Sequence, residues 1–427
     1  MHPPRPSRLS LFAAGCSLLI QRALLRIGAR RRVDGWRRAA GLVLRGDESN
    51  FVLSAFGLRA PGAFESGFSH ADPAARVSLA LRLAEFFDAR PLCRRVIRPG
   101  ALEDRIVAVE RAAFTLAVEP ASPGPERFLA PSRWEGEPFG CASAVDKPLL
   151  RIVCRACQRG GLDLWLRVNH VGADGAPMQE VLTQLESEWG FIEEVRFPDP
   201  DPFAPLVVTR PIAGGSAAHE VQFFADFTRL LDWRRAHNAR LPEPMTLAAA
   251  TLWCLARHSA LDRLHMGTTV EIAERFGLDR GVGVVVVRPA DFFHRPEGLV
   301  AYVRAFNRQM ERTRLRDATS CRTLDAAARL DPASATALLE HALRESPRAF
   351  GQLALTMLKD AKVFGAPLAS AGHAFGFIAV GSVALPTADG RRVGCVAVKG
   401  PAPLVAAYPA IFRDSIERGP LLPHPAS

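Results

Sequence analysis

Residues 169–175 read Asn169-His170-Val171-Gly172-Ala173-Asp174-Gly175, which contains a His-x-x-x-Asp-Gly motif. Before the motif, Leu162, Leu164, Leu166 and Val168 alternate with Asp163, Trp165, Arg167 and Asn169. Alternation with a period of two is typical of a strand with one buried face. The sequence therefore predicts that His170 stands where a strand ends.

The residues after the motif have the spacing of a helix. Asp174 and Gly175 come before Pro177, and proline is favoured in the first helical turn because its missing N–H needs no partner there. The apolar positions that recur at helical spacing are Met178, Val181, Leu182, Leu185 and Trp189. We predict a strand, a four-residue turn and a helix, in that order.

Both polar residues of the motif also have ordinary structural interpretations. Asp174 precedes the predicted helix, where an aspartate can accept hydrogen bonds from the first backbone N–H groups. His170 can be a half-buried histidine with satisfied hydrogen bonds. The motif alone leaves these interpretations open beside a catalytic one, because a short motif needs agreement from its context.

Positive charge is concentrated in an N-terminal arm, residues 1–46. The arm holds ten arginines and one acid, Asp34, for a charge of +9, and the whole chain carries +10. The remaining residues are therefore nearly neutral. This distribution does not predict a basic groove through the protein, and we expect no nucleic-acid partner.

Residues 9–20 of the arm form an apolar run that is too short to cross a bilayer, which needs roughly 20 apolar residues. Three interpretations stay open: a secretory signal, an amphipathic helix on a membrane surface with Arg22, Arg26 and Arg30 on its polar side, and a disordered or wrongly assigned N-terminus. We expect a cytoplasmic protein, which in the second case touches the inner face of the membrane.

The chain of 427 residues is too long for one ordinary core and indicates two domains. Residues 196–216 are proline-dense without an apolar period, so we interpret them as a linker between an N-terminal half, 47–195, and a C-terminal half, 217–427. Predicted helices cover 74–87, 227–237, 246–258, 297–312 and 333–343. Predicted strands cover 106–109, 114–118, 149–157, 162–169, 219–224, 267–272, 282–288, 376–385 and 394–399. Each half is predicted to be α+β.

The eight cysteines are scattered without a disulfide framework, which favours a reducing compartment. Cys154 and Cys157 stand three apart in a predicted strand, so their side chains would point to opposite faces. No second pair of Cys or His ligands lies near them in the sequence. We predict no metal site.

The motif from His170 to Gly175 resembles the shared mark of the chloramphenicol-acetyltransferase-like superfamily. This superfamily includes condensation domains of peptide synthetases, plant-type alcohol acyltransferases, wax ester synthases and polyketide-associated acyltransferases. Weaker similarity comes from residues 90–94, 147–151 and 281–283, and the resemblance extends over about residues 50–415. Asn169 stands where condensation domains usually have a first histidine, and the plant-type Asp-Phe-Gly-Trp-Gly motif is absent.

The resemblance implies an α+β fold of two chloramphenicol-acetyltransferase-like halves, each a mixed sheet with helices, that form a pseudo-dimer around a central channel. It implies no tightly bound cofactor, and acyl-CoA or acyl-phosphopantetheine as co-substrate. The implied acceptor is a hydroxyl or amine of a small molecule or lipid, and an acyl carrier protein is an implied partner. The cofactor-binding residues are not indicated.

The resemblance also implies roles for four residues. His170 would act as general base, a role that suits histidine because its side chain titrates near neutral pH. Asp174 would brace the turn by pairing with an arginine, for which Arg275 is the candidate. Gly175 would permit close approach of the backbone.

An acyltransferase is thus the leading hypothesis, and two alternatives remain beside it. One is a condensation-type domain that acts on carrier-bound substrates. The other is a catalytically silent homologue that binds an acyl chain or a lipid, since a fold does not by itself establish a reaction.

Overall fold

The computed structural model describes most of the chain after the basic arm. The described residues are 52–55, 58–59, 72–98, 105–120, 135–156, 161–168, 175–190, 208–211, 218–272, 281–327, 347–357, 363–366, 375–381, 385–386 and 390–418, with isolated positions between 330 and 342. The arm, residues 1–46, lies outside them. Among the described residues no helix has both the length and the apolar character needed to cross a membrane.

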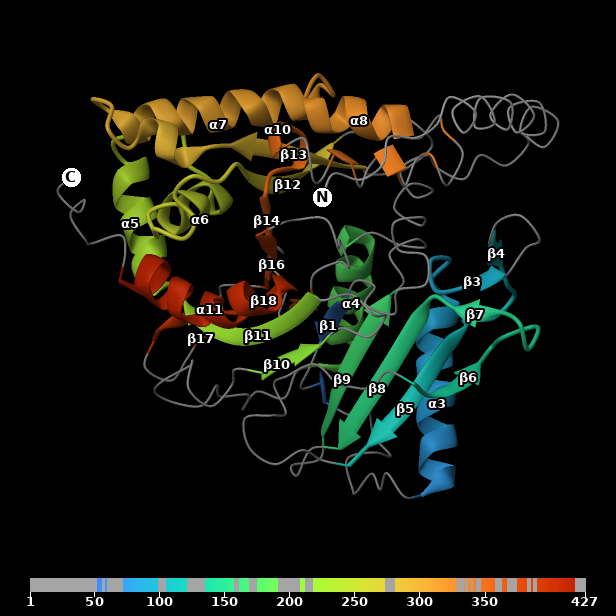
Figure 1. Ribbon diagram of the computed structural model, residues 1–427. Coiled ribbons are helices and arrows are strands. Elements are labelled where there is room, and N and C mark those ends of the chain that lie inside the picture. The colour runs from blue at the N-terminus through green and yellow to red at the C-terminus, as the bar shows by residue number, and fades with distance from the viewer. Residues whose placement is uncertain are drawn as a thin grey trace.

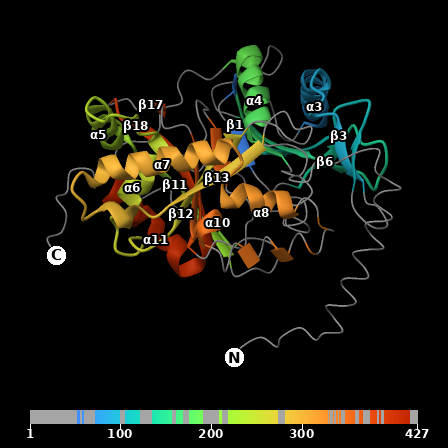
Figure 2. The same cartoon turned by 90° about the horizontal axis from the view of Figure 1, so that it is seen from above.

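The N-terminal half contains a five-stranded sheet in the order β2-β9-β8-β5-β6 and a three-stranded sheet in the order β4-β3-β7. Its elements are β1 (Val52–Ala55), β2 (Leu58–Arg59), α3 (Pro73–Asp88), β3 (Arg95–Arg98), β4 (Arg105–Ala108), β5 (Phe114–Glu119), β6 (Glu137–Phe139), β7 (Lys147–Pro148), β8 (Leu150–Ala156), β9 (Gly161–Val168) and α4 (Gly175–Trp189). Helices α3 and α4 lie on the same side of the larger sheet (Figures 1 and 2).

The C-terminal half is built on an eight-stranded sheet in the order β10-β11-β18-β16-β14-β12-β13, with β17 paired to β18. Its strands are β10 (Val208–Pro211), β11 (Ala218–Asp226), β12 (Met266–Ile272), β13 (Gly281–Val287), β14 (Leu353–Met357), β16 (Gly376–Val380), β17 (Leu385–Pro386) and β18 (Arg392–Pro401). Its helices are α5 (Thr228–Asn238), α6 (Leu247–Leu255), α7 (Gly298–Arg314), α8 (Thr319–Ala327), α10 (Pro347–Phe350) and α11 (Ala402–Phe412), with a 3-10 turn, η3 (Pro289–Phe292), and a π-helical turn, η4 (Arg413–Glu417).

Both large sheets are mixed. The pairs β5–β8, β12–β14 and β14–β16 are parallel, and the other pairs are antiparallel. Each sheet packs one face against helices around its own hydrophobic core. The predicted α+β class is confirmed.

Local sequence signals explain where the main helices begin. The Asp72 carboxylate accepts a hydrogen bond of 2.9 Å from the Ala74 N–H, and Pro73 occupies the first turn of α3. The Thr246 hydroxyl accepts from the Ala249 N–H at the start of α6. Helix α6 is apolar nearly all round, and it lies inside the C-terminal core as such a helix must.

Among the described strands, one pairing joins the two halves. Strand β1 pairs antiparallel with β15 (Val363–Ala366), so a strand of the predicted N-terminal half meets a strand of the C-terminal half. Strand β1 lies against β9, and β15 lies against β18 and β16. Figures 1 and 2 both place β1 between the two larger sheets. Strand β10 lies within the segment predicted as a linker and adds to the C-terminal sheet.

Candidate active site

The residues of the motif fall at the edge of the described structure. Strand β9 ends at Val168, and α4 begins at Gly175. His170, Asp174 and Arg275 lie outside the described residues, and only the backbone of Gly175 lies within them. The predicted strand and helix on either side of the motif are confirmed, whereas the positions of the three side chains stay predictions.

The strand and the helix around the motif are held in place by the same core. Leu164, Leu166 and Val168 of β9 share a buried cluster with Leu182 and Leu185 of α4. Leu182 is 1% exposed and Leu185 is fully buried. The helix therefore packs back on the strand that precedes it, and the six residues 169–174 must connect two fixed ends.

The register of the sheet shows which other strand ends lie near the motif. Val168, at the end of β9, is directly opposite Leu150, at the start of β8. Leu150 pairs in turn with Phe114, at the start of parallel β5. The connection that carries the motif therefore starts at the end of the sheet where β5 and β8 begin.

Arg90 ties α4 to the end of α3. Its Nε donates to Gln184 Oε1 and its Nη2 to Glu188 Oε1, both at 2.8 Å, and its Nη1 donates to the Phe86 carbonyl. The guanidinium carbon also lies 3.3 Å from the centroid of the Phe86 ring. A planar, forked donor is suited to this set of contacts, which fix the helix that follows the motif.

An ion pair between a partly exposed arginine and a buried aspartate lies at the same end of the N-terminal half. Arg98, the last residue of β3, donates from Nε and Nη2 to the two carboxylate oxygens of Asp146, at 2.7 and 2.9 Å. The Asp146 side chain has no exposed surface. The hydrogen bonds from Arg98 lower the pKa of the Asp146 carboxyl from its ordinary value. Asp146 precedes β7 and β8, so this pair helps to hold the start of β8.

The prediction that β9 has a single buried face is wrong. Leu162, Leu164 and Leu166 are buried as expected, but Asp163 is only 3% exposed and Trp165 is fully buried. A polar face can be buried when its charges find partners, and the register places Arg155 of β8 directly opposite Asp163. Arg155 Nε also lies 2.7 Å from Glu119 Oε2.

Three buried cysteines of the described chain are unsuited to act as nucleophiles. Burial raises the pKa of the Cys93 and Cys254 thiols to about 12 each, and it raises the pKa of Cys154 as well. These thiols therefore stay protonated near neutral pH, while thiolates are the reactive form. Cys157 lies outside the described residues, within which no cluster of three metal-ligating side chains occurs.

The known structures that this chain resembles share its fold. No protein-family model and no curated protein matches the sequence. TRI101 of F. graminearum, complexed with coenzyme A and T-2 mycotoxin, aligns with a TM-score of 0.51 and 13% identity, over 88% of this chain and 96% of that chain. The same protein with coenzyme A and deoxynivalenol gives a TM-score of 0.50 and 14% identity over the same shares. The chain therefore shares the fold of these TRI101 structures.

A third solved structure also matches the chain. The X-domain in complex with OxyB from teicoplanin biosynthesis aligns at 13% identity with a TM-score of 0.45, over 90% of this chain and 93% of that chain.

Sequence reasoning found some of these contacts and missed others. Arg90 belongs to a segment that already resembled the superfamily, although its contacts with α4 were not predicted. Arg98 and Asp146 are 48 positions apart and carry no motif, so their pairing depends on how β3 and β7 come together. The burial of Asp163 had no signal in the sequence, because a charge that alternates with apolar residues is equally typical of a strand face in water.

Proposed function

We propose that this protein is an acyltransferase that moves an acyl group from a thioester to a hydroxyl or amine acceptor. The observation that carries the proposal is the position of the His-x-x-x-Asp-Gly motif, between the end of β9 and the start of α4, in a chain that shares the fold of the TRI101 structures. The thioester would be acyl-CoA or acyl-phosphopantetheine. Structures of TRI101 with coenzyme A support the first of these donors.

His170 is the proposed general base. It would take the proton from the acceptor as the acceptor oxygen or nitrogen adds to the thioester carbonyl. Collapse of that adduct breaks the carbon–sulfur bond, and the proton leaves with the thiol. A positioned base of this kind contributes on the order of 10²- to 10⁴-fold in rate.

Asp174 and Gly175 have supporting roles in the proposal. Asp174 would brace the connection between β9 and α4 by pairing with Arg275, which lies in the sequence between β12 and β13. Gly175 would let the backbone approach the substrate. The two halves would face each other across a channel. The acceptors would be small molecules or lipids, and an acyl carrier protein would be the alternative source of the acyl group.

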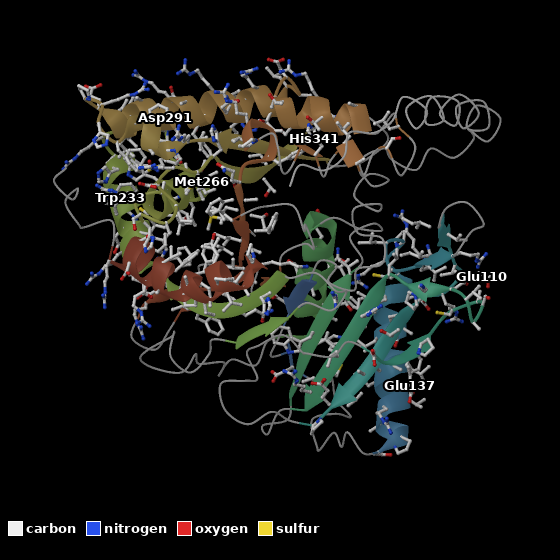
Figure 3. The ribbon with its side chains drawn as sticks, viewed as in Figure 1. Glu110, Glu137, Trp233, Met266, Asp291 and His341 are labelled. Atoms are coloured by element: carbon white, nitrogen blue, oxygen red, sulfur yellow. The ribbon has the colours of Figure 1, made fainter. Side chains whose placement is uncertain are left out.

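A thiol-release assay with a panel of acyl thioesters and alcohol or amine acceptors tests the proposal. We expect His170→Ala to lower turnover at least a hundredfold and to leave the melting temperature unchanged. The matched control is His294→Ala. His294 is exposed and lies three residues after Asp291. Figure 3 labels Asp291 in the C-terminal half, well away from the helix that Figure 1 labels α4. Full turnover in His170→Ala protein would contradict the proposal. A wild-type protein that binds thioesters but releases no thiol would instead support the silent homologue.

A further inference from the structure

Helix α7 has one face in the C-terminal core and one face in solvent. Tyr302 and Phe306 are buried in that core. Arg304, Arg308 and Arg312 are exposed, and their spacing of four residues puts them in one row along the helix surface. We call these three residues the arginine ridge. Figures 1 and 3 place α7 on the outside of the C-terminal half, with nitrogen-tipped side chains along its outer side.

Two arginines of the ridge form no ion pair with the described residues. Arg308 Nε donates to the Arg304 carbonyl at 3.4 Å, and neither guanidinium lies within ion-pair distance of a described acid. Arg312 differs, because its Nε lies 3.2 Å from Asp317 Oδ2. The ridge therefore keeps two uncompensated charges one helical turn apart.

The acids on α7 and beside it leave these charges uncompensated. Glu311 lies 2.7 Å from Arg314 Nη1, outside the ridge. Glu243 accepts a hydrogen bond of 2.9 Å from the side-chain amide of Asn307. Glu297 is exposed at the start of α7, about two turns before the ridge. Each of these acids lowers the local potential without pairing with the first two arginines of the ridge.

Positive charge is concentrated in the segment that contains α7. Residues 288–322 hold eight arginines and four acids, an excess of four positive charges. All residues after the N-terminal arm together have an excess of one, so the rest of the body is slightly acidic. The arm carries charge of the same sign as the ridge and is an unsuitable cover for it, because like charges repel. The ridge therefore suits an anionic partner from outside this chain.

An exposed apolar side chain stands beside the ridge. Leu315 directly follows α7 and is 76% exposed. It comes eleven residues after Arg304, about three helical turns, so the two residues lie on the same side of the helix. A lipid surface offers phosphates for guanidinium groups and an apolar boundary for leucine, whereas a soluble polyanion offers only charge.

We propose that the arginine ridge and Leu315 dock this protein on an anionic lipid surface. The guanidinium groups of Arg304 and Arg308 would bind lipid phosphates, and Leu315 would enter the boundary between headgroups and acyl chains. Helix α7 would lie along the surface with its other face still in the C-terminal core. The inference concerns attachment to a surface, and it does not depend on the proposed acyl transfer.

Co-sedimentation of the full chain with vesicles tests the docking. Vesicles of phosphatidylcholine with phosphatidylglycerol should bind the wild type, and vesicles of pure phosphatidylcholine should not. Each arginine near an anionic surface raises the partition coefficient about fivefold. Arg304→Gln combined with Arg308→Gln should therefore weaken binding on the order of tenfold or more. Arg304→Lys combined with Arg308→Lys, which restores both charges, should restore binding.

A matched control separates docking by the ridge from the effect of net charge. Arg82→Gln combined with Arg111→Gln also removes two charges, from exposed side chains of the N-terminal half, and should bind vesicles as the wild type does. Melting temperature and thiol release from soluble thioesters should be the same in all variants. An equal loss of binding in the ridge and control variants would overturn the inference, as would equal binding of the wild type to both kinds of vesicle.

Leu315→Ser distinguishes a lipid surface from a soluble polyanion. This variant should weaken vesicle binding about tenfold, the effect of burying one large apolar side chain. Binding of the soluble polyanion heparin should be unchanged in the same variant. Unchanged vesicle binding in Leu315→Ser protein would overturn the lipid surface. Binding of heparin through Arg304 and Arg308 with no binding to anionic vesicles would overturn it as well and would assign the ridge to a soluble polyanion.

Discussion

Arg155 is an almost completely buried arginine of the N-terminal sheet. It is 8% exposed, its Nε lies 2.7 Å from Glu119 Oε2, and it stands directly opposite the buried Asp163. Breaking a buried ion pair by removing one partner leaves the other charge without compensation. Removal of one partner therefore lowers the free energy of unfolding by more than the intact ion pair contributes to it.

We expect Arg155→Ala to lower the free energy of unfolding by about 3 kcal/mol, measured by urea denaturation. Arg82→Ala is the matched control, because its contact with Glu85 spans 3.9 Å between largely exposed side chains. An exposed pair of this kind contributes about 0–1 kcal/mol. A loss of less than about 1 kcal/mol in Arg155→Ala protein would show that Asp163 and Glu119 are satisfied by other groups.

Asp146 makes stability depend on pH in a defined direction. Arg98 lowers the pKa of the folded carboxyl, while the unfolded chain has an ordinary aspartate near 3.9. Because the pKa of Asp146 is lower in the folded protein than in the unfolded chain, its ionised carboxylate stabilises the fold at pH values above the unfolded pKa. This stabilisation is lost as the pH falls through the folded pKa.

The difference in unfolding free energy between wild type and Asp146→Asn should therefore be constant above about pH 5 and shrink below about pH 4. Urea denaturation of both proteins between pH 3 and pH 7 measures it. A difference that stays constant over this whole range would mean that the pair with Arg98 does not lower the pKa of Asp146 in solution.

At the scale of elements, β14 can lie beside β12 only because glycines stand where the two approach. Gly351 has a φ of +82°, and a Cβ there would lie 2.6 Å from the Gly267 backbone nitrogen. Gly390 has a similar φ of +80°, but a Cβ there would meet no atom within 4 Å. The two positions therefore separate the cost of the backbone conformation from the cost of the close approach.

Gly390→Ala should destabilise the protein by about 1–2 kcal/mol, the cost of a left-handed conformation for an L-residue. Gly351→Ala should cost at least about twice as much, because the backbone of β12 must also move. Thermal unfolding of the two variants side by side measures both costs. Equal shifts in melting temperature would show that β12 adjusts without strain.

Most elements with a clear local pattern could be predicted from the sequence. Helix α3 and the β8–β9 hairpin follow directly from apolar period and turn residues, and the structure places them within a residue or two of the predicted bounds. The burial of the second face of β9 could not be predicted, because alternation describes the strand and not what covers it. Strand β10 was not predicted because it lies in a proline-rich segment without an apolar period. Its extended structure depends on antiparallel pairing with β11, which a local pattern does not show.

At the scale of the whole molecule, the pairing of β1 with β15 was beyond local sequence reasoning. Val52 is opposite Ala366, so about three quarters of the chain separates the two strands. Each is only four residues long, and no turn sequence connects them. The candidate site has the same limitation. The motif predicts a histidine at a strand end. The residues that face this histidine across the candidate site depend on which distant segments the fold brings together.

Removal of β1 should therefore weaken both halves. A protein that lacks residues 1–46 keeps β1, and we expect its melting temperature to equal that of the wild type. A protein that lacks residues 1–57 loses the ladder from Val52 to Ala55 and leaves β15 without this partner. Loss of a few backbone hydrogen bonds, at about 1 kcal/mol each, should lower the melting temperature by about 5 °C or more.

Calorimetric scans of the two truncated proteins decide between a local and a shared role for β1. If β1 ties the halves together, the shorter protein should also lose cooperativity and unfold in two steps, because each half has its own hydrophobic core. A single sharp transition at the wild-type temperature would show that the halves stay joined without β1. Comparison of thiol release in the same two proteins would then show whether acyl transfer requires the halves to be joined by this strand pair.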